Sequence, residues 1–397
     1  MMLLNLLILL VLLALSVPAG LDSIYLLVQT LMSGRLPTPT PSARHLRFDI
    51  VVPAHNEAAG IARTVGNLLQ LDWPVDRYRI LVIADNCTDT TATLARAAGA
   101  TVLERQDPTL RGKGYALLFA FERSRIDAWA DAIAVVDADS EVSLNLLEAF
   151  AARIEHGASA VQAHHGVLNP GESWRTRLLT IAIAAYHVVR SRARERQRVS
   201  CGIRGNGWCV TLQLLAQVSY SAFSLAEDLE YGIALGLAGY RVHYAGEAHA
   251  SQDMAADPQV ARTQRQRWEH GRFQLIRLHT LALLQAAVRR RSAMCLDLAL
   301  DLLVLPFTYV VLNVAALLVA ALLAAWWSPG FTPWIWFSLG CVAVVLGYLL
   351  RGWQLSGTGA RGLLDLIRAP GFVIWKLMLV HSHQRSAEWI RTARKRS

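Results

Sequence analysis

The N-terminal segment from Met1 to Val28 is nearly continuous apolar sequence, and this run constrains the fold more than any other feature of the chain. Asn5, Pro18 and Asp22 interrupt it, but it still exceeds the ~20 residues that a helix needs to cross a bilayer. A cleaved signal peptide is the alternative. Because no Lys or Arg precedes the run and it is long for the apolar part of such a peptide, we expect residues 1–32 to form a retained membrane anchor.

Two further apolar runs follow, at about Leu296 to Ala325 and Trp334 to Leu350. The segment between them, residues 326–333, carries no charge and has aromatic side chains typical of a membrane interface. We therefore expect residues 293–351 to form two more spanning helices. With 54% hydrophobic residues the chain is too apolar for a simple soluble enzyme, and three spans are too few to build a transport pathway easily without oligomerisation.

Basic residues gather on one side of these spans, and the side rich in Lys and Arg faces the cytosol. All three spans agree in placing the central region and the C-terminus there, in a multi-pass protein of the cytoplasmic (inner) membrane. The formal net charge of +9 then indicates contact with anionic lipid, and because the charge follows the membrane flanks we expect no nucleic-acid partner. The basic flanks are Arg35, Arg44 and Arg47, then Arg289, Arg290 and Arg291, then Arg351 and the tail Arg394-Lys395-Arg396.

The C-terminal segment, residues 352–397, contains a short apolar run from Phe372 to Val380. We expect an amphipathic helix lying at the cytosolic interface, a depth that suits Trp375 and Lys376. A fourth span is the alternative, and it would place the Arg-rich tail outside, against the charge rule.

Strand and helix patterns alternate between the membrane segments. Residues 33–47 form a stiff linker because Pro37, Pro39 and Pro41 exclude helix. Residues 48–292 then predict a cytosolic α/β domain with a doubly wound, mostly parallel sheet, whose ligands bind beyond the carboxyl ends of the strands. The expected strands are Phe48 to Val52, Arg79 to Ile83, Thr101 to Leu103 and Ala132 to Val136, and the expected helices are Ala58 to Leu71, Thr88 to Ala98 and Lys113 to Arg123.

Two other features fit no motif. Arg190 to Arg198 is an Arg-rich stretch that we expect to end a helix and to face either lipid headgroups or water. The five cysteines show no Cys-x-x-Cys pair, which indicates free thiols in a reducing compartment.

Asp137 and Asp139 directly follow the apolar strand that ends at Val136. Residues two apart in an extended segment point the same way, and two carboxylates side by side repel each other unless a cation lies near them. Mg²⁺ and Mn²⁺ favour such oxygen ligands and commonly bridge substrate phosphates. The pair therefore predicts a metal and phosphate site, although aspartates are also common in plain loops.

Other polar residues end or follow the neighbouring strands. Asp85 lies where a nucleotide base could be hydrogen-bonded, while Thr88 or Asp89 is expected to cap the next helix. His55 and Glu57 fit the same pocket, His55 either stacking on the base or serving a structural role. Arg111-Gly112-Lys113-Gly114 precedes a helix, so its backbone amides and the Lys113 ammonium could approach phosphate.

Glu227 and Asp228 open an apolar helix. Ser224-Leu225-Ala226-Glu227 has the spacing of a capping box, which gives Glu227 a structural explanation. The structural explanation for Asp228 is weaker. Burial there would raise its pKa toward the working pH, which suits a general base that takes the proton of an attacking hydroxyl.

Two segments flank this base in sequence. Gln264, Arg267 and Trp268 lie on one face of a helix, where Arg can neutralise a leaving diphosphate and Trp can stack on a sugar ring or simply pack. Gly205 and Asn206 lie in a Gly-rich turn that allows close backbone approach to a substrate, or forms a plain tight turn.

With these residues together, the chain resembles the membrane-bound family 2 inverting glycosyltransferases with a GT-A fold, the branch that includes cellulose, hyaluronan and poly-N-acetylglucosamine synthases. The resemblance covers about Phe48 to Arg272 and the flanking membrane layout, and rests on Asp137-Ala138-Asp139, Ala226-Glu227-Asp228 and Gln264-x-x-Arg267-Trp268. It implies a metal-dependent hexosyltransferase using Mg²⁺ or Mn²⁺, a nucleotide-diphosphate sugar donor and a lipid or saccharide acceptor. Partner proteins of a polysaccharide or glycolipid pathway are candidates.

The resemblance also implies a role for each residue. Asp228 is the catalytic base, and Asp137 and Asp139 serve the metal and the diphosphate. The residues further implied to bind the donor are His55, Glu57, Asp85, Lys113 and Arg267. Those implied on the acceptor side are Gly205, Asn206, Glu227, Gln264 and Trp268.

Three departures from the family pattern weaken the case for processive polymer synthesis: Ala226 replaces the usual Thr, Ala84 replaces a second Asp, and Gly205-Asn206-Gly207-Trp208 differs from the usual acceptor segment. Two alternatives follow. One is transfer of a single sugar to a polyprenyl phosphate or another lipid, and the other is an inactive GT-A domain acting as a membrane scaffold.

Overall fold

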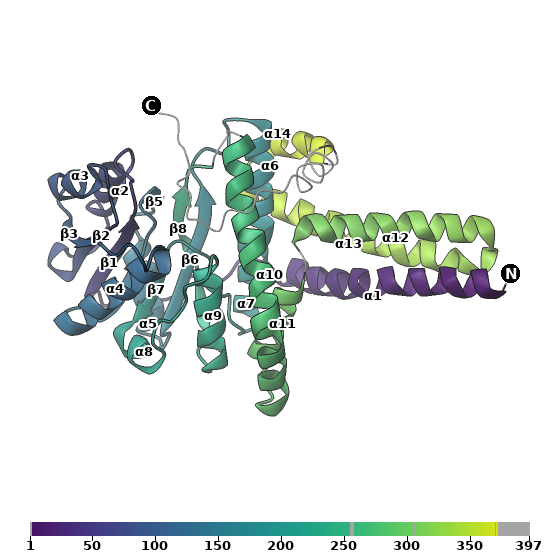
Figure 1. The fold of residues 1–397 in the computed structure, drawn as a ribbon, viewed down its shortest axis with the longest axis horizontal. Coiled ribbons are helices and arrows are strands. Elements are labelled where there is room, and N and C mark those ends of the chain that lie inside the picture. Colours follow the sequence, from purple (N-terminus) through teal and green to yellow (C-terminus); the bar gives the residue numbers. More distant parts are fainter. Residues whose placement is uncertain (1, 255–257, 305, 370, 372–397) are drawn as a thin grey trace.

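The computed structural model describes residues 2–254, 258–304, 306–369 and 371, and within these the side chains of 258–269 are not described. Figure 1 shows an α/β domain joined to a bundle of three long helices, with the N-terminus at the far end of the bundle. The helix expected at 372–380 lies outside the described residues.

An eight-stranded sheet forms the centre of the α/β domain, in the order β3-β2-β1-β4-β7-β6-β8-β5. The first four of these strands are parallel, β7 runs antiparallel to both of its neighbours, and β6 and β8 are parallel again. The predicted α/β fold with a mostly parallel sheet is therefore confirmed. The strands are β1 (Phe48–Ala54), β2 (Tyr78–Asp85), β3 (Thr101–Arg105), β4 (Ala132–Val135), β5 (Ser140–Val142), β6 (Ala160–Val167), β7 (Trp208–Thr211) and β8 (Val242–Gln252).

Helices cover both faces of the sheet because successive side chains of a strand point to opposite faces. In β1, Ile50 and Val52 enter one buried core together with Val65 and Phe150, while Val51 enters the core on the other face. The helices of this domain are α2 (Ile61–Leu68), α3 (Thr91–Ala97), α4 (Lys113–Asp127), α5 (Leu146–Ile154), α8 (Leu212–Gln217) and α9 (Glu227–Leu237).

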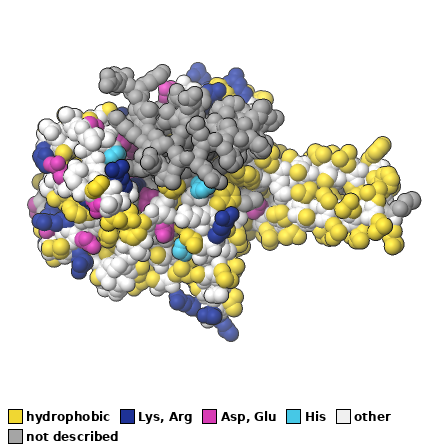
Figure 2. Space-filling model, in the orientation of Figure 1, with side chains coloured by type: hydrophobic (Ala, Val, Ile, Leu, Met, Phe, Trp, Pro, Cys, Tyr) yellow, Lys and Arg dark blue, Asp and Glu magenta, His cyan; other side chains and the backbone are white. Residues whose placement is uncertain are grey.

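Three helices in the described residues are long and apolar enough to cross a membrane. They are α1 (Met2–Met32), α12 (Phe307–Trp327) and α13 (Thr332–Ser356), the last two joined by a short turn, η3 (Pro329–Phe331). They pack side by side, and hydrophobic side chains cover much of the visible surface of their bundle (Figure 2). The expected apolar helices are thus present.

The predicted second span, Leu296 to Ala325, is wrong in its first part. A separate helix, α11 (Ala293–Leu303), ends before Pro306, and α12 begins at Phe307. Pro306 is the N-cap of α12. Proline has no backbone N–H to donate to the preceding helical turn and its ring clashes with that turn, so a continuous helix through this position is disfavoured. Residues 293–303 are apolar because they pack against α9 and α10 (Pro258–Arg289), not because they belong to the spanning helix.

Several helices lie between the sheet and the bundle (Figure 1). They include α6 (Trp174–Ile183), a π-helical turn η2 (Ala184–Val189), α7 (Arg190–Arg196) and α10 (Pro258–Arg289). The helix α14 (Gly359–Asp365), followed by a turn, η4 (Leu366–Arg368), contacts α6 and α13.

The expectation that Arg190 to Arg198 faces lipid headgroups or water is wrong for its two most buried members. Arg190 is 2% exposed and Arg194 is fully buried. Arg190 Nη1 lies 2.9 Å from Asp301 Oδ1, and Arg194 Nε lies 3.0 Å from Asp297 Oδ2. Because both carboxylates belong to α11, these buried ion pairs connect α7 to the segment that precedes the second span.

Candidate active site

A cavity of about 1590 Å³ lies beyond the carboxyl ends of β1, β2 and β4, where ligands of a parallel sheet are expected. Most of the residues predicted from the sequence line this one cavity although they are far apart in the chain. The predicted residues in its lining are His55, Glu57, Asp85, Lys113, Asp137, Asp139, Gly205, Glu227 and Asp228.

Asp137 and Asp139 lie in a turn rather than in an extended strand, because β4 already ends at Val135. The expected geometry of two side chains on one strand face is therefore wrong, although both residues line the cavity. Asn206 Oδ1 accepts the backbone N–H of Asp137 at 3.0 Å, and Asn206 Nδ2 donates to Ser140 Oγ at 2.8 Å. Asn206 is fully buried, and its two hydrogen bonds hold the turn that contains Asp137 and Asp139.

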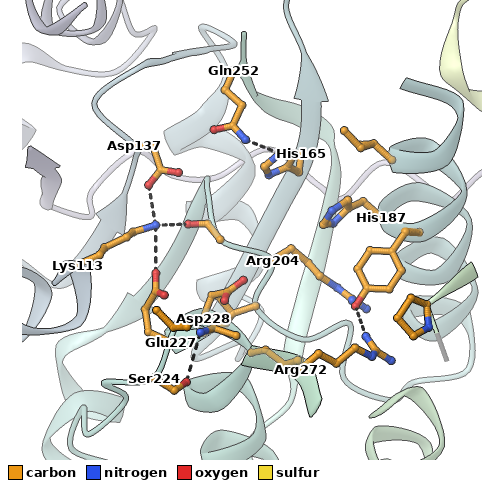
Figure 3. A pocket seen from close by; sticks show the side chains of 18 of the residues that line it. Lys113, Asp137, His165, His187, Arg204, Ser224, Glu227, Asp228, Gln252 and Arg272 are labelled. Atoms are coloured by element: carbon orange, nitrogen blue, oxygen red, sulfur yellow. Dashed lines mark hydrogen bonds and ion pairs between the residues drawn. The ribbon is translucent and has the colours of Figure 1, made fainter. Parts of the chain in front are cut away.

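Lys113 is the first residue of α4 and joins three parts of the site (Figure 3). Its Nζ lies 2.6 Å from Asp137 Oδ1 and 3.5 Å from Glu227 Oε1, and donates to the Gly205 carbonyl at 2.8 Å. Burial alone would lower the pKa of Lys113, but Asp137 and Glu227 hold it above its ordinary value. Lys113 is therefore a permanent cation between the two acidic segments.

Glu227 and Asp228 begin α9, but the predicted capping box is wrong. The N-cap is Ala226, without a side-chain cap, and the Ser224 backbone N–H instead donates to Glu230 Oε2 at 2.9 Å. Burial raises the pKa of Glu227 to about 7 against the opposing charge of Lys113, and burial also raises the pKa of Asp228. Glu227 can therefore exchange protons near neutral pH, and Asp228 keeps its proton to a higher pH than a free aspartate does.

Gly205 lies beside the Asp228 carboxylate. The φ of Gly205 is +85°, a backbone conformation that favours glycine, and a Cβ there would lie 3.4 Å from Asp228 Oδ2. The turn that contains it thus brings backbone, rather than a side chain, against the carboxylate.

Asp85 ends β2 at the far end of the cavity. Arg105 Nη1 donates to Asp85 Oδ1 at 2.6 Å, while Asp85 Oδ2 is buried without a hydrogen-bond partner among the described residues. The carbonyl of Asp85 is 2.8 Å from His55 Nδ1. This end of the cavity therefore presents one unsatisfied acceptor and one imidazole ring to a ligand. The prediction that Thr88 or Asp89 caps the next helix is wrong, because the N-cap of α3 is Thr90 without a side-chain cap; Asp89 Oδ1 accepts the backbone N–H of Thr91 at 3.0 Å.

Gln264, Arg267 and Trp268 belong to the first half of α10, and their side chains lie outside the described part of the structure. Arg272, on the same helix, is described and lines the cavity. Five further residues that were not predicted from the sequence also line the cavity: His165, Tyr186, His187, Arg204 and Arg272. Tyr186 and His187 carry no sequence signal because they reach the cavity through a π-helical turn.

The acidic turn fits a divalent cation. Asp137 and Asp139 offer oxygen ligands of the kind that Mg²⁺ and Mn²⁺ prefer. Asp137 and Glu227 lie within ion-pair distance of Lys113, and Asp139 and Asp228 line the same cavity. A divalent cation held by Asp137 and Asp139 would offset their negative charge and that of a diphosphate.

A mixed α/β sheet with an acidic cavity at the carboxyl ends of its parallel strands defines the class of GT-A-like proteins. Residues 45–271, more than half of the chain, match the family model described as glycosyltransferase like family 2, and the chain belongs to that family. A solved structure supports the fold alone: a mannosyltransferase from Pyrobaculum calidifontis in complex with GDP-Man and Mn²⁺ is 18% identical, with a TM-score of 0.52, covering 85% of this chain and 99% of that one.

Two curated relatives share part of the sequence. A 4,4'-diaponeurosporenoate glycosyltransferase of Staphylococcus aureus is 33% identical over 136 residues, which are 33% of this chain and 35% of the relative. A beta-monoglucosyldiacylglycerol synthase of Synechocystis sp. is 27% identical over 246 residues, 57% of this chain and 47% of the relative. The chain thus spans about a third of the length of the first relative and about half of the second.

Proposed function

We propose that this protein is a membrane-bound, inverting glycosyltransferase that moves a sugar from a nucleotide-diphosphate sugar to an acceptor hydroxyl. One observation carries the proposal: Asp137, Lys113 and Glu227, from three distant segments, meet within ion-pair distance in a cavity at the carboxyl edge of the sheet. Asp228 lines the same cavity beside them. Membership of glycosyltransferase like family 2 supports this assignment.

The donor would lie along the edge of the sheet. Its base would meet Asp85, His55 and Glu57, and its diphosphate would lie toward Asp137 and Asp139. These two aspartates would hold Mg²⁺ or Mn²⁺, which would supply charge neutralisation for the diphosphate. The mannosyltransferase with the similar fold was solved with a nucleotide sugar and Mn²⁺, which is consistent with such a site.

Asp228 would take the proton of the acceptor hydroxyl while the acceptor oxygen forms a bond to the anomeric carbon. The bond from that carbon to the diphosphate oxygen breaks, and the nucleoside diphosphate leaves with the electron pair. Attack from the face opposite the leaving group inverts the anomeric centre. Arg267 would assist the diphosphate, and Gly205, Asn206, Glu227, Gln264 and Trp268 would border the acceptor or shape its side of the site.

We further propose that α1, α12 and α13 span the cytoplasmic membrane with the α/β domain in the cytosol. Their length and apolar composition support this arrangement. The domain limits at 1–32, 33–47, 48–292, 293–351 and 352–397 remain predictions, as does the link to the cellulose, hyaluronan and poly-N-acetylglucosamine synthases. One curated relative is named a 4,4'-diaponeurosporenoate glycosyltransferase and the other a beta-monoglucosyldiacylglycerol synthase, and these names favour a lipid acceptor over a growing polymer.

The test uses membranes that contain the full-length protein, Mg²⁺ or Mn²⁺, and a panel of radiolabelled nucleotide sugars. Asp228→Asn should lower transfer by roughly 10²- to 10⁴-fold while nucleotide binding persists. Asp131→Asn, on the surface and away from the cavity, is the matched control and should retain activity. Near-normal turnover by Asp228→Asn would refute the assignment of the base, and nucleotide binding without turnover by the wild type would favour the inactive scaffold.

A further inference from the structure

The cavity does not end at the catalytic carboxylates but continues into an apolar groove. The groove lies between α6, α12 and α13 and is lined by Leu178, Ile183, Val311, Leu312, Leu346 and Leu349. Leu346 is 53% exposed and Ala315, at its edge, is also exposed, so the groove opens to the outside of the bundle. One continuous space therefore joins a charged chamber to an apolar channel.

The position of the groove relative to the bundle limits what can fill it. Val311 and Leu312 belong to the first turns of α12, and Leu346 and Leu349 to the later turns of α13, so all four lie at the end of the bundle beside the α/β domain (Figure 1). If α12 and α13 cross the bilayer, this end lies in the leaflet next to the catalytic domain. An apolar opening there meets lipid chains, not water.

A π-helical turn lies where the apolar groove meets the charged chamber. Such turns are rare and are frequently found at functional sites. Residues Ala184–Val189 adopt it, and it directs His187 toward the cavity beside His165, with the ring centroids 4.9 Å apart (Figure 3). Tyr186 in the same turn accepts a hydrogen bond from Arg272 Nη1 at 2.9 Å. Burial lowers the pKa of both histidines, so neither adds a positive charge at neutral pH.

Buried arginines gather at this junction. The guanidinium groups of Arg190, Arg194, Arg204 and Arg272 lie around the carboxylates of Asp22, Asp297 and Asp301, and Asp228 in the cavity also acts electrostatically on Arg204. A buried guanidinium group with unused hydrogen-bond donors is costly unless an anion approaches it.

Arg204 is the arginine best placed to receive such an anion. It lines the cavity and is 5% exposed, and its Nε donates to the Cys201 carbonyl at 3.1 Å. Its Nη2 is 3.7 Å from Asp301 Oδ2, beyond hydrogen-bond distance, and neither Nη1 nor Nη2 has a hydrogen-bond partner among the described residues. Arg204 directly precedes Gly205, whose backbone borders the Asp228 carboxylate. A group bound to Arg204 would therefore lie close to the base.

We infer that the acceptor is a membrane lipid with an acidic headgroup, and that it enters laterally between α6, α12 and α13. This inference rests on the proposed glycosyl transfer. The apolar chain occupies the groove, the acidic group of the headgroup pairs with Arg204, and a headgroup hydroxyl reaches Asp228. The hydroxyl proton passes to Asp228, the headgroup oxygen bonds to the anomeric carbon, and the nucleoside diphosphate leaves.

The groove is tested with two tryptophan substitutions on one helix. Ala315 and Ala316 are adjacent and exposed on α12, but only Ala315 lines the cavity. In membranes with radiolabelled nucleotide sugars, Ala315→Trp should lower label in the solvent-extractable product at least 10-fold, and Ala316→Trp should change it less than 2-fold. Donor hydrolysis to water should be the same in both variants. Equal effects of the two substitutions, or label only in water-soluble or high-mass product, would overturn the inference.

The headgroup is tested without turnover, by mass spectrometry of lipid that co-purifies with the full-length protein in detergent. The wild type should be enriched in acidic lipid over the source membrane, Ala315→Trp should carry less lipid, and Arg204→Gln should lose the acidic enrichment. Arg291→Gln, at an exposed juxtamembrane position, controls for non-specific attraction and should keep it. Lipid of bulk membrane composition in the wild type overturns the inference. Failure of the proposed function shows differently, as absence of both transfer and donor hydrolysis in the wild type.

Discussion

Lys113 Nζ lies 2.6 Å from Asp137 Oδ1, so the first residue of α4 is bound to the turn that follows β4. The same ammonium group is 3.5 Å from Glu227 Oε1 at the start of α9. One cation thus fixes the spacing between the segment proposed to hold the donor phosphates and the segment proposed to supply the base. Without it, the carboxylates of Asp137 and Glu227 would face each other in a buried cavity.

Replacing Lys113 by Met should therefore reduce kcat/KM for the donor by roughly 100-fold, because positive charge aimed at a developing diphosphate contributes strongly to the rate. Steady-state kinetics with the radiolabelled donor measures this effect. Arg123→Met removes an exposed cation from the same helix, one that pairs with Asp127 3.0 Å away, and should change the rate less than 2-fold. Equal losses in the two variants would show that Lys113 acts only through the stability of α4.

The raised pKa of Asp228 predicts how activity depends on pH. The proposed base must be ionised to accept a proton, so kcat/KM should fall about 10-fold per pH unit below the raised pKa of Asp228. Glu227→Gln removes one negative charge beside Asp228. The pKa of Asp228 should then fall, and the acid limb of the profile should move to lower pH. A limb that stays in place would mean that neither carboxylate controls proton transfer.

The raised pKa of Glu227 predicts a change in stability of the opposite sense. Because folding raises the pKa of Glu227 from 4.5 to about 7, its favourable contribution is complete below about pH 4.5 and is lost as the pH rises through about 7. Glu227→Gln should therefore be more stable than the wild type at pH 8, by on the order of 1–3 kcal/mol, and no more stable at pH 4.5. Thermal unfolding in detergent at the two pH values checks this, and a gain at pH 4.5 as large as at pH 8 would contradict it.

The buried ion pairs between α7 and α11 predict a large stability effect far from the sheet. Asp301→Asn should destabilise the protein by about 3–5 kcal/mol, because Arg190 and Arg194 would lose the carboxylate that compensates them. Asp72→Asn breaks the surface pair in which Arg44 Nη2 lies 2.7 Å from Asp72 Oδ2, and should cost less than about 1 kcal/mol. Denaturation midpoints that differ little between the two variants would show that water reaches the Asp301 cluster.

The sequence predicted best those features that depend on neighbouring residues. The alternation of strands and helices placed Asp85, Asp137 and Asp139 at the carboxyl edge of one sheet, and the structure brings them to one cavity. The apolar runs likewise predicted three long helices that are present. In each case the signal is a local pattern of hydrophobicity, which the fold follows directly.

The features that the sequence did not predict depend on contacts between distant segments. The Arg-rich stretch predicts a surface position, because nothing in the neighbouring sequence indicates that Arg190 pairs with Asp301, 111 residues away. Ser224 has the spacing of a capping residue, but its backbone N–H donates to Glu230. The N-cap of α9 is instead Ala226, which has no side-chain cap. The π-helical turn that carries Tyr186 and His187 has no sequence signature at all, so the apolar half of the cavity could not be anticipated.

Gly114, the residue after Lys113, gives the last prediction. A Cβ at Gly114 would overlap the carbonyl oxygen of Ala222 and lie 3.3 Å from Phe223 Cα, in the loop that leads to α9. Gly114→Ala must therefore displace either α4 or this loop, and should lower kcat/KM roughly 10-fold by moving Lys113 away from Glu227. Gly66→Ala is the matched change, because Gly66 lies in α2 with nothing within 4 Å of the added carbon. It should leave activity unchanged and raise stability by about 0.5–1 kcal/mol. Unaltered kinetics in Gly114→Ala would mean that the contact of α4 with the loop before α9 does not position the catalytic carboxylates.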